Sequence, residues 1–548
     1  MVESLERLRR ALGLRTDAVI FFVSAGLTVV FVAAAIAFTD SVDRIFRAAS
    51  GWIMGNLGWV YILGVTSFLV FLIWIALSRY GHVRLGGYDA RPDYRNSVWF
   101  AMLFAAGIGT ILMFWGVAEP ISHFAEPPRA HIEPESTEAA NTAMAYSLYH
   151  FGLHTWAIFT LPALAFAYFV YQRGLPFRLS SAFHPFLGDR IHGRLGRTID
   201  VAAVIGTLFG VAVSIGLGTL QINSGLAELF GVEESKLVQI VLITVVTAIA
   251  TTSVVLGLDK GIKRLSTLNI SMAVGLMTFV FLAGSTVYLA KGIIEMTGNY
   301  LSSLVPLAFW NDTFADSGWQ DTWTVFYWAW TITWSPFVGM FIARVSRGRT
   351  IREFVLGVLA LPTGFTIVWF SVFGLSAFDI EMNGTGGLVE NVVDEGDIPG
   401  ALFQFLSNYP LATLISSIAV LIVVIFFTTS SDSASLVIDN LCSGDRVHPT
   451  PTRQRVFWAV TEGVVAGTLI AATGKGGLDA VSEVITVLGL PFFVLAFLMM
   501  ASLYRALRTD YPDLHRPQLP PSIRTMPKKA NRRGLRRQAE QRKAQQGE

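Results

Sequence analysis

The sequence has few of the residues on which most catalytic and metal sites depend. Its 548 residues include one cysteine, Cys442, so neither an intrachain disulfide nor a thiolate metal cluster can form. The nine histidines contain no HExxH pair, and no GxxxxGK[ST] loop is present to bind a nucleotide. No nucleophile, base and orienting group occur together in a recognisable arrangement. We therefore expect neither an enzyme nor a pump driven by its own nucleotide site.

Charged residues are also scarce, at 15%, whereas apolar residues make up 53% of the chain. Apolar runs of about 20 residues, long enough to cross the hydrocarbon core of a bilayer, occur twelve times. We therefore predict an all-α polytopic membrane protein with twelve transmembrane helices. The predicted spans are residues 18–38, 58–78, 98–118, 142–171, 198–226, 236–258, 264–292, 322–345, 354–378, 411–441, 454–473 and 479–504.

Basic residues predict the orientation, because Lys and Arg remain on the cytoplasmic side of a membrane. Counted along the connections between spans, they alternate between high and low numbers without a break, from four before the first span to twelve after the last. The connection 379–410 has no basic residue and several acidic ones, which predicts an external loop. The alternation predicts that both termini are cytoplasmic.

Two spans contain helix-breaking residues at matching places. The third contains Gly107 and Gly109, and the eighth contains Pro336 and Gly339. Five spans separate their starts, as a five-plus-five inverted repeat requires, and we expect both helices to be interrupted there. The alternative is that these residues only let helices pack closely. The predicted organisation is a cytoplasmic segment 1–17, two peripheral helices in 18–97, a first repeat 98–292, an external linker 293–321, a second repeat 322–504 and a basic cytoplasmic tail 505–548.

A few ionisable residues fall inside or beside the predicted spans. His150 and His154 lie one turn apart on the fourth span. We favour hydrogen bonds inside the helix bundle over metal binding for them, because no third ligand is evident. Intramembrane acids are candidates for proton relays or for structural hydrogen bonds. They are Glu119, Asp200, Asp432, Glu462 and Glu483.

The eighth span and its flanks carry the most specific motif. The run WTVFYWAWTITWSPFVGMFIARVSRGRTIREF, from Trp323 to Phe354, resembles the signature of the betaine/choline/carnitine transporter family, closest to that of its sodium-coupled glycine-betaine members. Similar matches are FAAGIG and WGVAEP on the third span, HFGLHTWA on the fourth, FGVAVSIGLGTLQI on the fifth and TTSSDSASLV on the tenth. The resemblance implies a fold of the inverted-repeat amino-acid-transporter type with two extra N-terminal helices, and commonly a homotrimer.

The same resemblance implies an aromatic cage for the substrate. The retained cage residues are Trp156, Trp330, Trp334 and Phe337. Phe151 and Phe159 stand where betaine carriers typically have Trp and Tyr, and Thr331 replaces a Trp. Phenylalanine keeps an aromatic face that attracts a cation weakly, whereas threonine removes that face. These changes predict weaker binding of a trimethylammonium group or a different ligand.

The resemblance also extends to the substrate carboxylate. Gly107 and Gly109 would let the third span leave helical geometry and present backbone N–H groups to it. Ile111 replaces the family's third glycine, and this change departs from the pattern of the betaine carriers.

Neutral oxygens are the preferred ligands of sodium at an unwound membrane helix. By resemblance, the main sodium site consists of two hydroxyl side chains and three backbone carbonyls. They belong to Thr429, Ser430, Ala105, Ile108 and Phe426. A second family site needs two hydroxyls on the fifth span, where only Thr207 remains because the other position is Val211. No Lys or Arg occurs in 198–226 to replace the ion, and this favours dependence on sodium.

The tail 505–548 carries twelve basic residues, and it could bind anionic lipid or remain a disordered solvated segment. The resemblance implies that such a tail senses ions and lipid in osmotically regulated members. Our interpretation is uptake of glycine betaine, or a related quaternary-ammonium or zwitterionic solute, by sodium symport across a bacterial-type plasma membrane. We expect no nucleic-acid partner and no cofactor besides the coupling ion. The alternatives are proton-coupled uptake of choline, or a sensor or channel on the same scaffold.

Overall fold

The computed structural model describes residues 2–87, 89–105, 109–256, 259–444, 450–472 and 477–515. Within these ranges the regular structure is helical, apart from one isolated β-bridge between Arg84 and Thr350. The chain divides by its internal packing into Met1–Tyr504 and Arg505–Glu548. The basic tail from residue 516 onward lies outside the described residues, as do Gly107 and Ile108.

Helices cover the predicted spans. The first half of the chain forms α1 (Val2–Ala11), α2 (Ala18–Ala37), α3 (Thr39–Leu77), η1 (Arg79–His82), α4 (Asn96–Ala105), α5 (Gly109–Ala125), α6 (Thr137–Phe151), α7 (Leu153–Ala167), η2 (Tyr168–Gln172), η3 (Leu179–Phe183), α8 (His184–Leu187), η4 (Gly188–His192), α9 (Arg194–Phe230) and α10 (Lys236–Leu256). The second half forms α11 (Asp259–Ala283), α12 (Thr286–Phe309), η5 (Asp321–Val325), α13 (Phe326–Val345), α14 (Ile351–Asn383), η6 (Glu390–Asp394), α15 (Ala401–Ser407), α16 (Ala412–Ser443), α17 (Thr452–Ala472), α18 (Gly477–Asp510) and α19 (Pro512–His515).

Nine helical stretches among the described residues are long and apolar enough to cross a membrane. The other three predicted spans are also helical, in α4 and α5, in η5 and α13, and in α17. The all-α membrane class is therefore confirmed. The total of twelve spans and the inverted repeat stay predictions.

The seventh predicted span, residues 264–292, is divided between two helices. α11 ends at Ala283, and α12 begins at Thr286 and fills most of the predicted linker 293–321. Gly284 follows the last turn of α11 and donates its N–H to the carbonyl of Val280, an ordinary way to end a helix. The apolar run continues across this break, so hydropathy alone could not locate it.

The predicted interruption of the eighth span is wrong, because α13 runs through Pro336 and Gly339 without a break. Pro336 has no backbone N–H, so the helix loses one hydrogen bond, the one to the carbonyl of Ile332. Gly339 serves close packing instead: a Cβ atom there would lie 3.1 Å from the backbone nitrogen of Ala163 on α7. For this glycine the packing alternative is the correct one.

The fourth predicted span contains a break that the sequence analysis missed. α6 ends at Phe151 and α7 begins at Leu153, with Gly152 between them in a non-helical conformation. The hydroxyl of Tyr300 on α12 accepts a hydrogen bond from the backbone N–H of Leu153 at 2.9 Å. This bond satisfies one of the backbone N–H groups that the break leaves without a helical partner.

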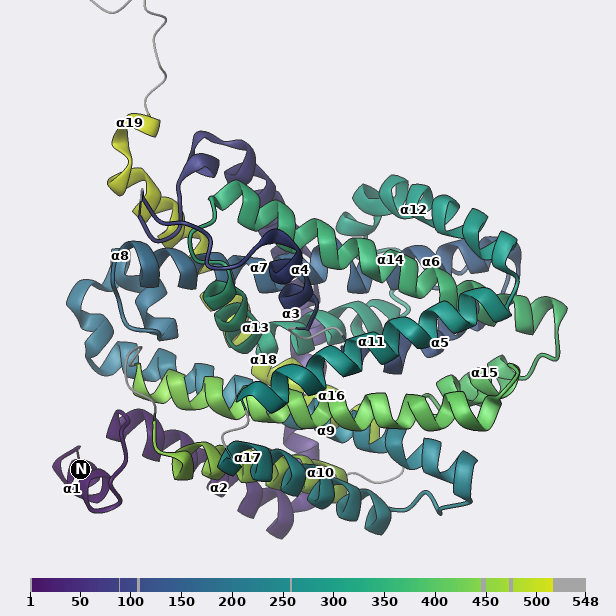
Figure 1. Ribbon diagram of the computed structural model, residues 1–548, viewed down its shortest axis with the longest axis horizontal. Helices are drawn as coiled ribbons and strands as arrows, with labels where there is room; N and C mark the ends of the chain where they lie inside the picture. Colours follow the sequence, from purple (N-terminus) through teal and green to yellow (C-terminus); the bar gives the residue numbers. More distant parts are fainter. Residues whose placement is uncertain are drawn as a thin grey trace, which may run out of the picture. The chain divides into compact units, whose positions relative to one another are not determined.

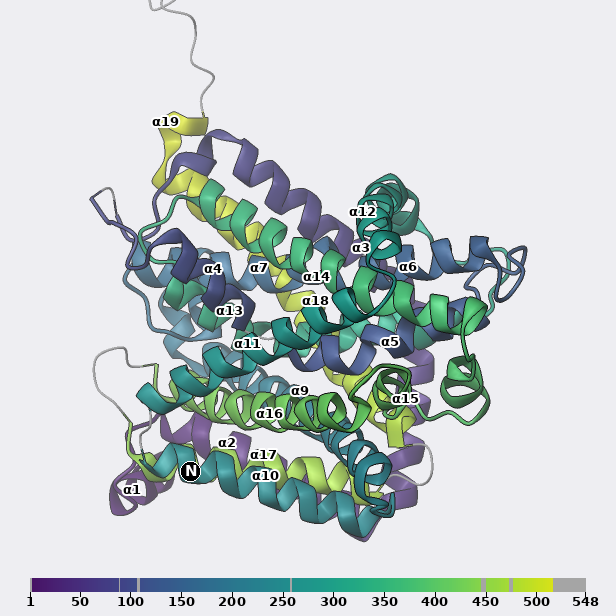
Figure 2. The same ribbon diagram turned by 45° about the vertical axis from the view of Figure 1, so that its right-hand side comes forward.

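The helices differ in how far they are buried, and this difference locates the core of Met1–Tyr504. Nearly all residues in the most apolar part of Thr137–Gln172, which contains α6 and α7, are buried, whereas most of those in Lys236–Leu256 are not, and they expose apolar side chains suited to lipid. α7 packs along α13, α9 packs along α16, and α10 packs along α17. The last two pairs lie side by side in both ribbon views (Figures 1 and 2).

Candidate functional site

Four aromatic side chains form a column along α13, here called the aromatic column: Tyr327, Trp330, Trp334 and Phe337. Successive ring centres are 6.5 Å, 6.3 Å and 6.1 Å apart, and each of the three cage residues in the column is less than 5% exposed. The spacing of three to four residues places these rings on one helix face. The structure therefore brings Trp330, Trp334 and Phe337 together.

Two neighbouring helices extend the aromatic column at Tyr327. Phe151, at the end of α6, lies 5.0 Å from the Tyr327 ring, and Trp115 of α5 lies 5.4 Å from it. Phe151 was predicted from the family pattern, whereas Tyr327 and Trp115 were not. No local pattern distinguishes them from other buried aromatics, because their contact depends on how α5, α6 and α13 pack.

The remaining predicted cage residues lie on α7 and α13. Trp156 and Phe159 are both nearly fully buried on α7, with ring centres 5.6 Å apart. In the described part of the chain no ring contact joins this pair to the aromatic column, although α7 and α13 pack directly against each other. Thr331 is buried on α13, next to Trp330. The cage residues thus occupy two adjoining helices.

The aromatic column and the neighbouring Trp115 contain polar groups without a protein partner in the described structure. The indole N–H groups of Trp330, Trp334 and Trp115 are buried and make no hydrogen bond within the described residues. Buried donors in native proteins are nearly always satisfied by protein, water or ligand. A small ligand with an acceptor group and an apolar or cationic body fits these requirements.

The predicted sodium ligands are described only in part. Thr429 on α16 donates its hydroxyl to the carbonyl of Ile425 at 2.9 Å, and the same hydroxyl lies 3.1 Å from the carbonyl oxygen of Phe426. Ser430 follows it and is half-buried. Ala105 is the last residue of α4, and α5 begins at Gly109. The oxygens of Thr429 and Phe426 are close enough to bind one small cation.

A residue that the sequence analysis missed supports this part of α16. Asn269 of α11 is fully buried, and its carboxamide is best oriented with the nitrogen donating to the carbonyl of Ile422 and the oxygen accepting from the N–H of Phe426, both at 3.2 Å. Asn269 thus engages the two backbone groups that one helical hydrogen bond would join, one turn before Thr429. The proposed ligand of the second site, Thr207, is buried, and its hydroxyl has no partner among the described residues.

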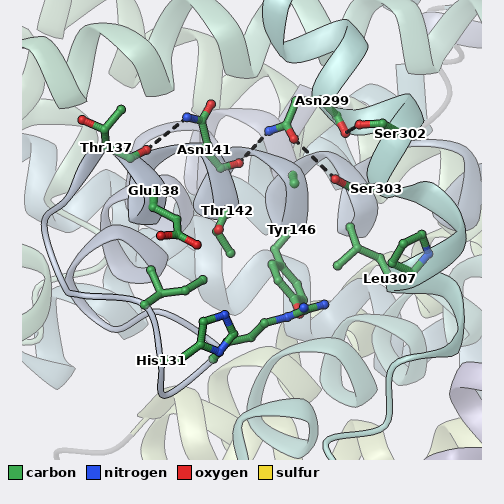
Figure 3. A pocket seen from close by; sticks show the side chains of 14 residues that line it. His131, Thr137, Glu138, Asn141, Thr142, Tyr146, Asn299, Ser302, Ser303 and Leu307 are labelled. Atoms are coloured by element: carbon green, nitrogen blue, oxygen red, sulfur yellow. Dashed lines mark hydrogen bonds between the residues drawn. The ribbon is translucent and has the colours of Figure 1, made fainter.

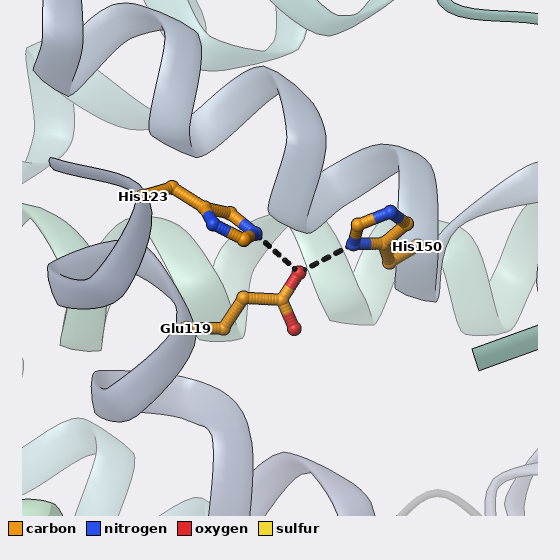
Figure 4. A group of neighbouring side chains, drawn as sticks. All are labelled: Glu119, His123 and His150. Carbon is orange, nitrogen blue, oxygen red and sulfur yellow. Dashed lines mark hydrogen bonds and ion pairs between the residues drawn. The ribbon is translucent and has the colours of Figure 1, made fainter. Parts of the chain in front are cut away.

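The hydrogen bonds expected for His150 are confirmed, but their partners are new. Its Nδ1 lies 2.6 Å from Glu119 Oε1, and its Nε2 lies 2.9 Å from the hydroxyl of Thr324. His123 of α5 is also 3.3 Å from the same carboxylate oxygen (Figure 4). His154 does not join this group, and both its ring nitrogens lack partners within the described chain. The sequence could have indicated the contact between Glu119 and His123, because the spacing Glu-x-x-x-His puts both residues on one helix face.

Long apolar helices around a buried aromatic site are the architecture of a membrane carrier for small organic solutes. A family model described as betaine/carnitine/choline family transporter matches residues 19–512, and this chain belongs to that family. Its members are transporters, and so this protein is a transporter and not an enzyme.

Curated relatives agree with the family match. The chain is 50% identical over 507 residues to an ectoine/glycine betaine/proline transporter of Corynebacterium glutamicum, covering 92% of this chain and 82% of that protein. It is 42% identical to a glycine betaine transporter of Acinetobacter baylyi, covering 90% of this chain and 73% of the relative. It is 38% identical to a high-affinity choline transport protein of Escherichia coli, again covering 90% and 73%.

Proposed function

We propose that this protein accumulates glycine betaine, or a closely related zwitterionic solute, by symport with sodium. The observation that supports this proposal most is the aromatic column, in which the buried Trp330 and Trp334 keep indole N–H groups without a protein partner. Aromatic faces attract a trimethylammonium group, and each such contact contributes about 0.5–2 kcal/mol. The free N–H groups suit the carboxylate of the same ligand.

The names of the relatives support the same class of solute. Glycine betaine is named for the Corynebacterium and Acinetobacter proteins, and ectoine and proline are named for the former. Ectoine and proline have no trimethylammonium group. A site in which Phe151, Phe159 and Thr331 replace stronger aromatics would therefore discriminate less strictly for that group. We propose glycine betaine as the main substrate, with ectoine and proline as weaker ones.

Sodium is proposed as the coupling ion because hydroxyl and carbonyl oxygens meet on α16. The Thr429 hydroxyl lies 3.1 Å from the Phe426 carbonyl, and Asn269 engages the backbone N–H of Phe426. Sodium bound there would favour the outward-open state, and the solute would then bind at the aromatic column. Rocking of the helix bundle releases both inside. We propose one sodium ion as the minimum, since Thr207 has no second hydroxyl one turn away.

Proton-coupled choline uptake is the second candidate. The 38% identity to the choline transport protein of Escherichia coli favours it. Choline has the trimethylammonium group but no carboxylate, so it would leave the indole N–H groups of the aromatic column without a charged acceptor. The two candidates therefore differ in how strongly binding depends on the carboxylate.

Membrane orientation, assembly and regulation are inferred from the basic residues and the family resemblance. We propose a multi-pass protein of a bacterial-type plasma membrane with both termini cytoplasmic, assembled as a homotrimer. The basic tail 505–548 would contact anionic lipid and adjust transport to osmotic strength. The alternation of Lys and Arg supports the orientation, and the family resemblance supports the trimer and the regulation.

The binding step can be tested with pure protein in detergent. Titration calorimetry should detect glycine betaine only when sodium is present, and choline should bind more weakly. Trp334→Leu should weaken betaine binding strongly. Trp328→Leu is the matched control, because Trp328 lies on the same helix and is fully buried but packs against Tyr149 and His154. Equal binding of betaine by the wild type and Trp334→Leu would refute the aromatic site.

A further inference from the structure

We propose that Glu119, His123 and His150 bind one divalent transition-metal ion of the zinc type. This inference goes beyond the proposed transport function and does not depend on which solute is carried. The three residues come from two helices, α5 and α6, and all are fully buried. They lie outside the aromatic column but adjoin it, since the His150 ring lies 4.9 Å from the Tyr327 ring.

The geometry brings three metal-binding atoms to one point (Figure 4). Glu119 Oε1 is 2.6 Å from His150 Nδ1 and 3.3 Å from His123 Nε2, and one ligand atom from each residue lies within 4.8 Å of the others. Bonds of about 2.0–2.2 Å from zinc to nitrogen and oxygen place neighbouring ligands a little over 3 Å apart. The shortest contact must therefore lengthen by about 0.7 Å when a metal replaces a proton.

The donor set is one that zinc uses. Two imidazoles and one carboxylate with a fourth position left open form a common zinc site. Glu119 also has a second oxygen, Oε2, that makes no close hydrogen bond among the described residues, although the Tyr327 hydroxyl interacts with this carboxyl group, and Oε2 could complete the coordination or hold a water. Without a cation, this buried carboxyl group must hold a proton or carry an uncompensated charge, which costs several kcal/mol in a protein interior.

The surroundings orient the ligands. The hydroxyl of Thr324 lies 2.9 Å from His150 Nε2, and this outer partner fixes the ring so that Nδ1 faces Glu119. The indole rings of Trp319 and Trp323 pack on His123 at 4.9 Å and 4.5 Å between ring centres. Aromatic packing on one side and a hydrogen-bonded outer partner on the other are what hold metal ligands in a single arrangement.

A polar pocket offers a route to the cluster. This pocket of about 580 Å³ lies where the chain before α6 meets α12, and Tyr146 forms part of its wall (Figure 3). The Tyr146 ring is 6.4 Å from the rings of both His123 and His150, so the wall of the pocket adjoins the cluster. His131 and Glu138, both exposed, line the pocket and can supply transient ligands, while Arg129 is held over the Trp310 ring.

Metal binding here would act on transport through the helices that it joins. The ion would hold α5 to α6, and the contact of His150 with Thr324 would extend this link to the segment before α13. α5 carries Trp115, α6 carries Phe151, and α13 carries the aromatic column. We therefore expect bound zinc to slow the rearrangement that transport needs, while leaving the solute contacts in place.

The test measures metal binding by the full-length protein rather than its transport. Purified protein should bind one Co²⁺ per chain with the visible absorption of a tetrahedral site, and Zn²⁺ should displace it. His123→Ala and Glu119→Gln should abolish that absorption, and Thr324→Val should weaken zinc binding about ten- to a hundredfold. His154→Ala is the matched control, because His154 is as fully buried and has no contact with Glu119 in the described structure.

Two results would overturn the proposal. One is the absence of a tetrahedral cobalt spectrum with the wild-type protein, which needs no variant and is independent of any folding defect. The other is a stoichiometry that stays at one per chain in His123→Ala or falls equally in His154→Ala, because either result would place the metal elsewhere. A failure of solute uptake would leave this measurement unaffected.

Discussion

Replacing Gly210 by alanine should test the position of Trp334 with a single methyl group. Gly210 lies on α9, and a Cβ atom there would be 2.7 Å from Cδ1 of the Trp334 ring and 2.7 Å from the hydroxyl oxygen of Thr333. Ordinary contacts of this kind begin at 3.4 Å, so the indole must move back by about 0.7 Å. Overpacking of this size costs about 1–3 kcal/mol.

The expected functional effect follows from the proposed contact with the solute. Loss of one aromatic contact, at about 0.5–2 kcal/mol, raises the Kd for glycine betaine by about two- to thirtyfold. Gly216→Ala is the matched control, because a Cβ at Gly216 of the same helix would meet only Ile470 side-chain atoms at 3.8 Å. Binding measured by calorimetry for both variants decides the matter. An unchanged Kd in Gly210→Ala would refute the placement of Trp334 against the solute.

Three further changes have defined outcomes. Thr429→Ala should raise the sodium concentration for half-maximal binding several-fold in a sodium titration, whereas Thr428→Ala, which removes a hydroxyl with the same type of backbone bond, should not. Gly152→Ala should lower the unfolding temperature, because its Cβ would lie 2.4 Å from a carbonyl oxygen, and Gly298→Ala, with open space around it, should not. Partial desolvation of the exposed Glu234, in the connection before α10, and the nearby charge of Asp397 raise the pKa of Glu234, so ionisation weakens folding as pH rises through that pKa. Glu234→Gln should therefore raise thermal stability at neutral pH but not at pH 4, and a loss at neutral pH would contradict this.

The membrane class could be predicted from sequence because each span depends on a local property, its length of apolar residues. The break between α11 and α12 could not, since the apolar run continues across Gly284 and Ser285. Likewise the break at Gly152 involves a hydrogen bond from the N–H of Leu153 to Tyr300, a contact between residues distant in sequence that no local pattern predicts. The predicted break at Pro336 was wrong for the opposite reason. A proline locally favours a break, but packing of α13 on α7 keeps the helix intact around one missing hydrogen bond.

The candidate site shows the same division. Trp330, Trp334 and Phe337 could be placed together because three- and four-residue spacing on a helix determines their common face. Trp115 and Tyr327 join them only through packing between helices. Asn269 could not be identified, since its role depends on meeting the backbone of α16. The contact of His123 with Glu119 could have been predicted from sequence, because their spacing of four residues puts them on one helix face.

The measurement that tests the central proposal most directly is uptake of labelled glycine betaine into proteoliposomes that contain the pure protein. An inward sodium gradient should drive accumulation above the external concentration, and a sodium ionophore should abolish it. Replacing external sodium by potassium at the same pH should leave only the background uptake of protein-free vesicles. Accumulation that persists without sodium and follows an imposed proton gradient would contradict sodium symport.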